Sequence, residues 1–286
     1  MTVLSAQPEH RVSRSMRQRH YLTCAPTYFD VAYAINPWMD PNSPVDADRA
    51  YLQWDILRNT YLALGHKVDV IDPEPGLPDM VFAANGGLVV GGHAYTAQFA
   101  FPQRGPEGPA YQKWFLSAGL IDVHEAAETN EGEGDFLTLA DVILAGTGFR
   151  TTIAAHIEAA AALDRAVVSL KLVDPRFYHL DTALAVLENG FGPEPAEIAY
   201  FPAAFSLHSQ QTLRQLFPSA VIVNEADACE FGLNAVSDGY NVVLPRNVTD
   251  MADQLRDRGY NPVGVDLSEF LRAGGSVKCC TLELHQ

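Results

Sequence analysis

The sequence predicts a globular α/β fold assembled from about five repeated units, and three observations support this prediction. Of the 286 residues, 48% are hydrophobic and 19% are charged, which is typical of a chain with ample material for a core. Helix-like stretches alternate with short β-rich runs, and a glycine or proline usually separates the two. The theme recurs about every 50 residues, a period typical of radial or stacked repeats.

The first helix-strand pair is the clearest. We expect a helix at residues 46–64, with acidic residues at its start and Gly65 at its end. Its apolar residues recur every three or four positions and so share one face: Tyr51, Trp54, Leu57, Tyr61 and Leu64. A strand is expected directly afterwards, at residues 67–71.

Four further helix-strand pairs follow the same plan. We expect their helices at residues 109–118, 153–163, 205–217 and 250–258, and their strands at residues 120–123, 166–172, 220–223 and 262–265. Additional strands are expected at residues 87–90, 142–145, 183–187 and 241–244. A doubly wound α/β sheet shows similar alternation and is the competing fold.

The chain shows no linker, so we expect one catalytic domain at residues 23–286 after a leader at residues 1–22. The leader is polar, carries four arginines and lacks the apolar segment of a secretory signal. No apolar run reaches the roughly 18 residues that a membrane span needs. These features predict a cytoplasmic protein with no membrane partner.

The formal net charge of −16 argues against a nucleic-acid partner, because phosphate binding requires a basic surface. The four cysteines show neither zinc-site spacing nor the density of a disulfide scaffold. We therefore expect reduced thiols and no metal or cofactor. The sequence leaves open whether the chain forms a homo-oligomer.

The segment at residues 273–282, AGGSVKCCTL, carries the first candidate for catalysis. Two glycines permit close backbone approach before a short expected strand that presents the thiol of Cys279. A thiolate attacks electrophilic carbon when its surroundings favour ionisation. The alternative is that Cys279 and Cys280 simply pack in the core, as free cysteines often do.

The segment at residues 177–182, FYHLDT, offers an acid–base pair. If this segment is a strand, His179 and Asp181 share one face. The histidine could then protonate a leaving amine while the aspartate orients it or holds the substrate. A loop histidine bonded to its neighbour would look the same in sequence.

Two more polar segments are candidates for substrate binding. In residues 130–136, NEGEGDF, glycines let several carboxylates crowd one turn, which suits a cation but also describes a solvated loop. Residues 79–87, DMVFAANGG, predict a strand that ends in an Asn-Gly-Gly hairpin turn at Asn85. Arg104 and Arg150 have the planar fork that suits a carboxylate, although lone arginines are commonly surface charge.

In this order and at these distances, the four segments resemble the guanidine-modifying enzyme superfamily, also called penteins, from about Tyr28 to Leu284. That family includes arginine deiminase, dimethylarginine dimethylaminohydrolase, the amidinotransferases and arginine dihydrolase. The resemblance implies a five-bladed α/β propeller of pseudo-repeats around a central site, in agreement with the repeat count. It also implies a small guanidino substrate.

The resemblance assigns roles to individual residues. Cys279 matches the nucleophile and His179 the general acid and base. Asp181 matches a residue that binds guanidinium nitrogens, and Arg104 and Arg150 match the arginines that hold the α-carboxylate. Glu131 matches the acid that aligns the guanidinium. Because the glycine-rich motif is longer here than in the family, Glu133 or Asp135 could share that task.

One departure bears on the reaction. Deiminases and dimethylarginine hydrolases have an aspartate at the position of Asn85, whereas arginine dihydrolases resemble this chain, with a second asparagine matching Asn36. An amide both donates and accepts, so it can hold a charged guanidinium or a neutral ureido group. The resemblance thus favours arginine dihydrolase, giving ornithine, ammonia and carbon dioxide. Dimethylarginine hydrolysis, amidine transfer and arginine binding without catalysis are the alternatives.

Overall fold

The computed structural model describes residues 14–285 and shows a mixed α/β fold, as the sequence predicts. In this part of the chain the strands form one six-stranded sheet, β2-β1-β15-β3-β4-β5, and three sheets of three strands. The sheets contain both parallel and antiparallel pairs. A single parallel sheet would be needed for the doubly wound alternative, which is therefore wrong.

Five three-stranded units with one strand order recur along the described chain. In each unit a central strand pairs antiparallel with one neighbour and parallel with another, and a helix joins the parallel pair. The last four units each follow the order strand, strand, helix, strand. The second unit consists of β3 (Gly87–Val90), β4 (His93–Thr96), α2 (Glu107–Ser117) and β5 (Asp122–His124), and the third consists of β6 (Phe136–Thr138), β7 (Val142–Thr147), α3 (Ile153–Leu163) and β8 (Ala166–Lys171). The fourth unit consists of β9 (Leu184–Glu188), β10 (Glu197–Tyr200), α5 (Leu207–Leu216) and β11 (Val221–Ile222). The fifth consists of β12 (Val236–Ser237), β13 (Asn241–Pro245), α7 (Asp250–Asp257) and β14 (Asn261–Val265).

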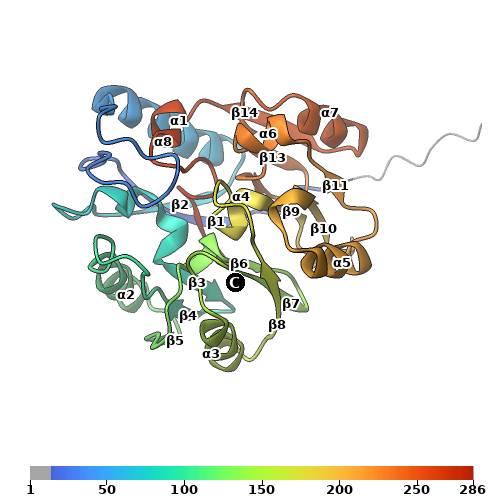
Figure 1. Cartoon of the computed structure of the whole chain (residues 1–286), viewed down its shortest axis with the longest axis horizontal. Coiled ribbons are helices and arrows are strands. Elements are labelled where there is room, and N and C mark those ends of the chain that lie inside the picture. The colour runs from blue at the N-terminus through green and yellow to red at the C-terminus, as the bar shows by residue number, and fades with distance from the viewer. Residues whose placement is uncertain (1–13, 286) are drawn as a thin grey trace, which may run out of the picture.

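The first unit is assembled from both ends of the described chain. Its central strand β1 (His20–Cys24) pairs parallel with β2 (Lys67–Ile71) after helix α1 (Ala47–Ala63). Its antiparallel strand is β15 (Leu282–His285), which also pairs with β3. In Figure 1, α1, α2, α3, α5 and α7 lie around the rim, while β1, β6 and β9 lie nearer the middle. The segment that carries Cys279 is thereby brought toward the middle.

Short helices occupy the connections between the longer elements. Three are α-helical turns, namely α4 (Leu180–Ala183), α6 (Glu225–Cys229) and α8 (Ser268–Leu271). Four are 3₁₀ turns, namely η1 (Pro78–Val81), η2 (Ala83–Gly86), η3 (Gly132–Gly134) and η4 (Pro202–Ala204). Several of these turns carry the polar residues discussed below.

Helix α1 forms where the sequence predicts it. Asp46 caps its N-terminus by accepting a hydrogen bond from the Arg49 amide, and Gly65 follows with φ +86°. The predicted apolar face is largely confirmed, since Trp54, Leu57 and Tyr61 are buried. Tyr51 is an exception: it is 52% exposed, and the small Ala50 occupies the buried position on that side of the face.

Two segments expected to be strands, and a third for which a strand was one of two alternatives, have another conformation. The segment before Asn85 forms η1 and η2 instead of a hairpin strand, and the hairpin turn of β3 and β4 lies at Gly91 and Gly92. His179 is the N-cap residue of α4, so it does not share a strand face with Asp181. Cys279 lies in a turn three residues before β15. Short segments packed among several neighbours take their conformation from those contacts, which local sequence does not reveal.

The expected leader ends inside strand β1, because His20, Tyr21 and Leu22 already pair with β2. Ion pairs of Arg14 with Glu197 and of Arg17 with Glu188 hold the preceding segment against β9 and β10. Residues 1–13 lie outside the described part of the chain. No described helix combines the length and the apolar character of a membrane span.

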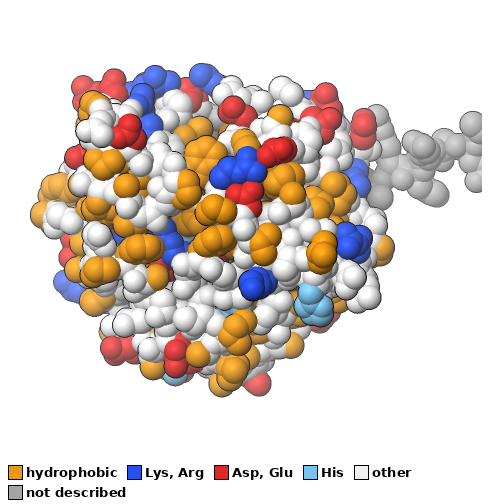
Figure 2. All heavy atoms as spheres, in the orientation of Figure 1, with side chains coloured by type: hydrophobic (Ala, Val, Ile, Leu, Met, Phe, Trp, Pro, Cys, Tyr) orange, Lys and Arg blue, Asp and Glu red, His pale blue; other side chains and the backbone are white. Residues whose placement is uncertain are grey.

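The surface carries mixed charge. Figure 2 shows acidic and basic side chains interspersed with hydrophobic ones, and on the face drawn the basic groups do not merge into a broad patch. This face therefore lacks the broad basic area that phosphate binding requires.

Candidate active site

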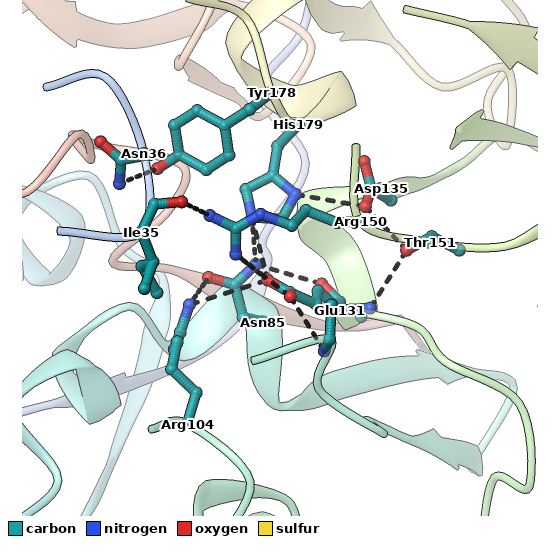
Figure 3. Close-up of polar contacts among 12 residues, drawn as sticks. Ile35, Asn36, Asn85, Arg104, Glu131, Asp135, Arg150, Thr151, Tyr178 and His179 are labelled. Carbon is teal, nitrogen blue, oxygen red and sulfur yellow. Dashed lines mark hydrogen bonds and ion pairs between the residues drawn. The ribbon is translucent and has the colours of Figure 1, made fainter. Parts of the chain in front are cut away.

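Loops from different units meet at a small cavity. It is lined by residues far apart in sequence, including Asn36, Asn85, Arg104, Arg150 and Cys279. Figure 3 shows that several of these side chains converge with Glu131 and His179 in one polar network. The structure thus brings together residues from all the segments that the sequence singles out.

The Cys279 thiol is buried between a carboxylate and an amide. Its Sγ atom donates a hydrogen bond to Asp181 Oδ2 at 3.3 Å and accepts one from Asn234 Nδ2 at 3.1 Å. Burial, together with the Asp181 carboxylate, raises the pKa of this thiol well above its usual range. Without a cation beside it, the sulfur is therefore neutral at pH 7, and ionisation requires a change at the site.

The glycines before Cys279 are needed for close packing. Gly274 has φ +79°, a left-handed conformation that favours glycine. A Cβ atom added at Gly275 would lie 2.2 Å from the Phe82 ring. The turn therefore packs directly on the wall of the cavity, which fixes the Cys279 backbone.

His179 lies between two carboxylates. Its Nε2 atom is 3.2 Å from Glu131 Oε2, and its Nδ1 atom is 3.2 Å from Asp135 Oδ2. Burial alone lowers the pKa of His179, but Asp135 and Glu131 outweigh burial and raise it to about 9. The imidazole is thus protonated at pH 7, and both ring nitrogens donate to carboxylates, as Figure 3 shows. A protonated histidine can act as a general acid.

Glu131 is held ionised by its neighbours. Arg150 contacts both of its carboxylate oxygens, at 3.1 and 3.2 Å. Burial favours the neutral acid, but Arg150, His179 and Arg104 overcome this effect and lower the pKa of Glu131. Asp135 is fixed by hydrogen bonds from Thr151 Oγ1 at 2.7 Å and from the Leu180 amide at 3.1 Å.

Asp181 differs from these two acids. It is fully buried, and its Oδ1 atom has no hydrogen-bond partner among the described residues. Burial raises its pKa to about 6, despite the opposing charges of His179 and Lys278. A buried carboxylate with a free oxygen beside a thiol is suited to bind a cationic group that lies against the sulfur.

Arg104 and Arg150 are both buried, so the alternative that they are surface charges is wrong. Arg104 forms a two-pronged ion pair with Glu107, at 2.9 and 2.7 Å, and donates to Asn85 Oδ1 at 2.9 Å. Arg150 donates to the Ile35 carbonyl at 2.8 Å and stacks on Tyr178. Both line the cavity, where a carboxylate clamp stays a prediction.

The two asparagines of interest have different surroundings. Asn85 Nδ2 donates to the Glu131 carbonyl at 3.1 Å and lies 3.5 Å from His179 Nε2. Asn36 Nδ2 donates to the Ala273 carbonyl at 3.0 Å and to Tyr178 Oη at 3.2 Å. Asn85 therefore joins the acid–base network, whereas Asn36 ties a long loop to the segment before Cys279.

Glu133 does not share the position of Glu131 and Asp135. All three acids are buried, which excludes the solvated-loop alternative. Glu133 is paired with Lys278 and His285, away from His179. Among the described residues, no group of three or more His, Cys, Asp or Glu side chains is arranged to hold a metal ion.

Sequence reasoning missed two polar residues of the site. Asp79 lines the cavity, is 1% exposed and has an Oδ1 atom without a hydrogen-bond partner in the described chain. It begins the segment at residues 79–87, where the sequence predicts a strand and no binding residue before Asn85. Asn234 contacts Cys279 from the connection before β12, and no motif in the FGLNAVSDG segment marks it.

Comparisons with known proteins identify close relatives of this chain. It is 56% identical over 272 residues, 95% of its own length and 88% of the relative's, to an N(G),N(G)-dimethylarginine dimethylaminohydrolase of Mycobacterium tuberculosis. It is 37% identical over 93% of its length to the bifunctional arginine dihydrolase/ornithine cyclodeaminase ArgZ of Synechocystis, of which it spans 37%. No family model matches the chain.

A solved structure of one of these relatives has a similar fold. The N-terminal domain of ArgZ, described as an arginine dihydrolase of cyanobacteria and bound to substrate, superposes with a TM-score of 0.87 at 34% identity. The match covers 94% of this chain and 99% of that domain. The similarity therefore extends over the whole fold that positions the cavity.

Proposed function

The chain belongs to the guanidine-modifying enzyme superfamily, and on that premise we propose that it is a hydrolase of the arginine guanidino group, specifically an arginine dihydrolase. The products are ornithine, ammonia and carbon dioxide. One observation carries the proposal: the Cys279 thiol lines a cavity together with two arginines, it contacts the half-satisfied Asp181 carboxylate, and the protonated His179 lies next to the cavity-lining Asn85. A guanidinium is a cation with a carbon open to a thiolate, which suits this set of groups.

Charge complementarity orients the substrate. The guanidinium lies against Asp181 and Glu131, and the α-carboxylate lies toward Arg104 and Arg150. Asp79 offers an unpaired, buried oxygen in the same cavity, which suits the α-ammonium group. Binding of the cation beside the sulfur favours loss of the thiol proton, because it offsets the burial and the Asp181 charge that keep Cys279 neutral.

The first hydrolysis then proceeds through a covalent intermediate. The Cys279 thiolate attacks the guanidinium carbon, and His179 gives its proton to the departing ammonia. The neutral imidazole next takes a proton from water, which attacks the S-alkylthiouronium carbon and releases the thiolate. The product of this step is the ureido compound citrulline.

The second hydrolysis repeats these steps on the ureido carbon. Cys279 attacks, a second ammonia leaves, and water cleaves the thioester-like intermediate to a carbamate, which loses carbon dioxide to give ornithine. Retention of the neutral ureido group requires a site that does not depend on substrate charge. The neutral amide of Asn85, which both donates and accepts beside His179, meets this need.

Hydrolysis of dimethylarginine to citrulline and dimethylamine is the second candidate. It is favoured by the 56% identity to the mycobacterial relative that carries this name. The two reactions share the nucleophile and the acid–base residue, so the Cys279 and His179 geometry supports both. The asparagines at positions 36 and 85 favour the dihydrolase.

We also propose that the five repeated units close into a five-bladed propeller around the site. The support is the shared strand order of all five units and the completion of the first unit by the C-terminal strand β15. A ring of blades would place the loop before each inner strand at one centre. Asn85 and Cys279 come from such loops, whereas Asn36, Arg104 and Arg150 come from connections between a central strand and its helix.

Product analysis with labelled substrate tests the reaction. Purified protein is incubated with arginine labelled at the guanidino carbon, and separately with citrulline and asymmetric dimethylarginine, and products are followed by mass spectrometry. From arginine we expect labelled carbon dioxide and unlabelled ornithine. Citrulline from dimethylarginine with arginine untouched would replace the proposal with the second candidate.

Two controls belong to this experiment. The Cys279→Ser protein should bind arginine without turning it over, which separates catalysis from contaminating activity. Transfer of the amidino group to an added amine would indicate an amidinotransferase, and binding without any product in the wild-type protein would indicate a binding protein.

A further inference from the structure

Asn234 contacts the Cys279 residue at two points. Its Nδ2 atom donates to Cys279 Sγ at 3.1 Å, and its Oδ1 atom accepts from the Cys279 backbone amide at 3.1 Å. Asn234 is completely buried. Its backbone carbonyl also accepts a hydrogen bond from the Lys278 amide at 3.3 Å. Side chain and backbone together therefore fix the turn that presents the thiol.

The orientation of the Asn234 amide is determined by its partners. The Cys279 backbone amide can only donate, so it must face the Asn234 oxygen. The Asp181 backbone carbonyl can only accept, and it lies 3.2 Å from Asn234 Nδ2. Both contacts require the same orientation, in which an N–H group points at the sulfur. The sulfur thus has a fixed donor on one side and the Asp181 carboxylate on the other.

We propose that Asn234 is a positioning residue that stabilises the thiolate of Cys279 by donating a hydrogen bond to Sγ while holding its backbone. A donor to sulfur favours the anion, because the thiolate is a stronger acceptor than the thiol. The inference rests on the proposed function, since it assigns the cause of nucleophile activation in that reaction. It also extends to Asp181, whose backbone the same amide holds.

Two substitutions separate thiolate stabilisation from a purely structural role. Asn234→Asp keeps the shape and the acceptor for the Cys279 amide but replaces the donor with an oxygen. Asn234→Ala removes both groups. A structural role predicts that Asp is tolerated better than Ala, because it preserves the backbone contact. Thiolate stabilisation predicts that Asp is at least as harmful as Ala, because its oxygen repels the anion.

The readout is the rate of Cys279 alkylation by iodoacetamide as a function of pH, located by peptide mass spectrometry. Below the thiol pKa the rate follows the thiolate fraction, so both variants should react about 10- to 100-fold more slowly than wild type at a given pH. Asn189→Asp is a matched control: Asn189 is a buried asparagine whose Oδ1 accepts from the Phe191 amide, outside the cavity. It should leave the rate unchanged. Circular dichroism and thermal midpoints confirm that each variant is folded.

The outcomes are distinct. Wild-type alkylation rates in Asn234→Asp and Asn234→Ala would overturn the inference, as would an Asp variant that reacts faster than the Ala variant. Because alkylation needs no substrate, a chain that hydrolyses neither arginine nor dimethylarginine but shows the expected rates would refute the proposed function and leave this inference standing.

Discussion

Glu131 and Glu133 are two residues apart in one turn, yet they belong to different regions of the molecule. Glu131 contacts Arg150, which lines the cavity, and His179. Glu133 faces the opposite side and pairs with Lys278 and His285. The same residue type thus supports the acid–base network on one side and joins chain segments on the other.

Adjacent residues in the C-terminal turn divide in the same way. Cys279 contacts Asp181 and Asn234, whereas the neighbouring Lys278 reaches Glu133. The Glu133–Lys278 pair therefore joins the two turns on the side away from the cavity. Residue type and spacing identify these two turns in the sequence, but only their packing determines which side chains reach the cavity.

The largest effect should come from the nucleophile. Cys279→Ser should lower kcat by about 10⁴-fold or more, because a serine oxygen is far less ionised and less nucleophilic toward the guanidinium carbon. Single-turnover assays with arginine measure this, with calorimetric binding of arginine as the control for an intact cavity. Turnover within tenfold of wild type would show that another residue attacks.

Glu131→Gln should lower kcat by about 10²- to 10³-fold, because it removes the charge that holds His179 protonated and aligns the guanidinium. Steady-state assays of arginine consumption measure this. The thermal midpoint should also fall, because Arg150 and His179 lose a buried counter-charge, so kcat is measured per folded molecule. An unchanged kcat would remove Glu131 from the acid–base network.

Glu133→Gln should lower stability and leave activity largely intact. It removes the counter-charge of the partly buried Lys278, and breaking this pair costs up to about 3 kcal/mol of unfolding free energy. Urea denaturation measures this loss, while activity per folded molecule should stay within a few-fold of wild type. A Glu133→Gln protein of normal stability but without activity would reverse the division between the two sides.

The raised pKa of His179 predicts a pH dependence of stability. Its value of about 9 in the folded protein lies above the ordinary 6.5, because Asp135 and Glu131 favour the imidazolium. The resulting stabilisation is fully present below pH 6.5 and is lost as pH rises through 9, by at most about 3 kcal/mol.

Urea denaturation across this pH range should show the decline in wild type and a smaller one in His179→Gln. Parallel curves for the two proteins would mean that His179 is not held protonated. The difference between wild type and His179→Gln reports on the network of Glu131 and His179 alone, because the substitution leaves the Glu133–Lys278 pair intact.

The smallest expected effect concerns the second hydrolysis. Asn85→Asp should slow citrulline consumption by about tenfold relative to arginine consumption, because an aspartate favours a charged guanidinium over a neutral ureido group. Citrulline should then accumulate from arginine, and chromatography of the products measures it. Equal losses on both substrates would show that Asn85 does not distinguish the two steps.

Much of the fold could be predicted from periodicity. The expected ranges 67–71, 87–90 and 153–163 coincide with β2, β3 and α3, and α1 differs only at its capping residues. These elements carry their own signals, namely an amphipathic repeat, glycine stops and β-branched runs. The strands expected before Asn85 and at Cys279 are turns in the structure, and His179 caps a short helix, because the conformation of these segments depends on packing against other units.

The candidate residues and their chemistry follow from the amino-acid sequence alone, since the thiol, imidazole and carboxylate groups can be read directly from the chain. Their partners depend on how the units pack in the tertiary structure. It separated Glu133 from Glu131 because Gly132, with φ +53°, packs so closely on Gly87 that a Cβ atom would lie 2.6 Å from its backbone, which orients the whole turn. It also brought Asn234 to Cys279 across 45 residues. Such contacts arise from the assembly of units, and no local pattern encodes them.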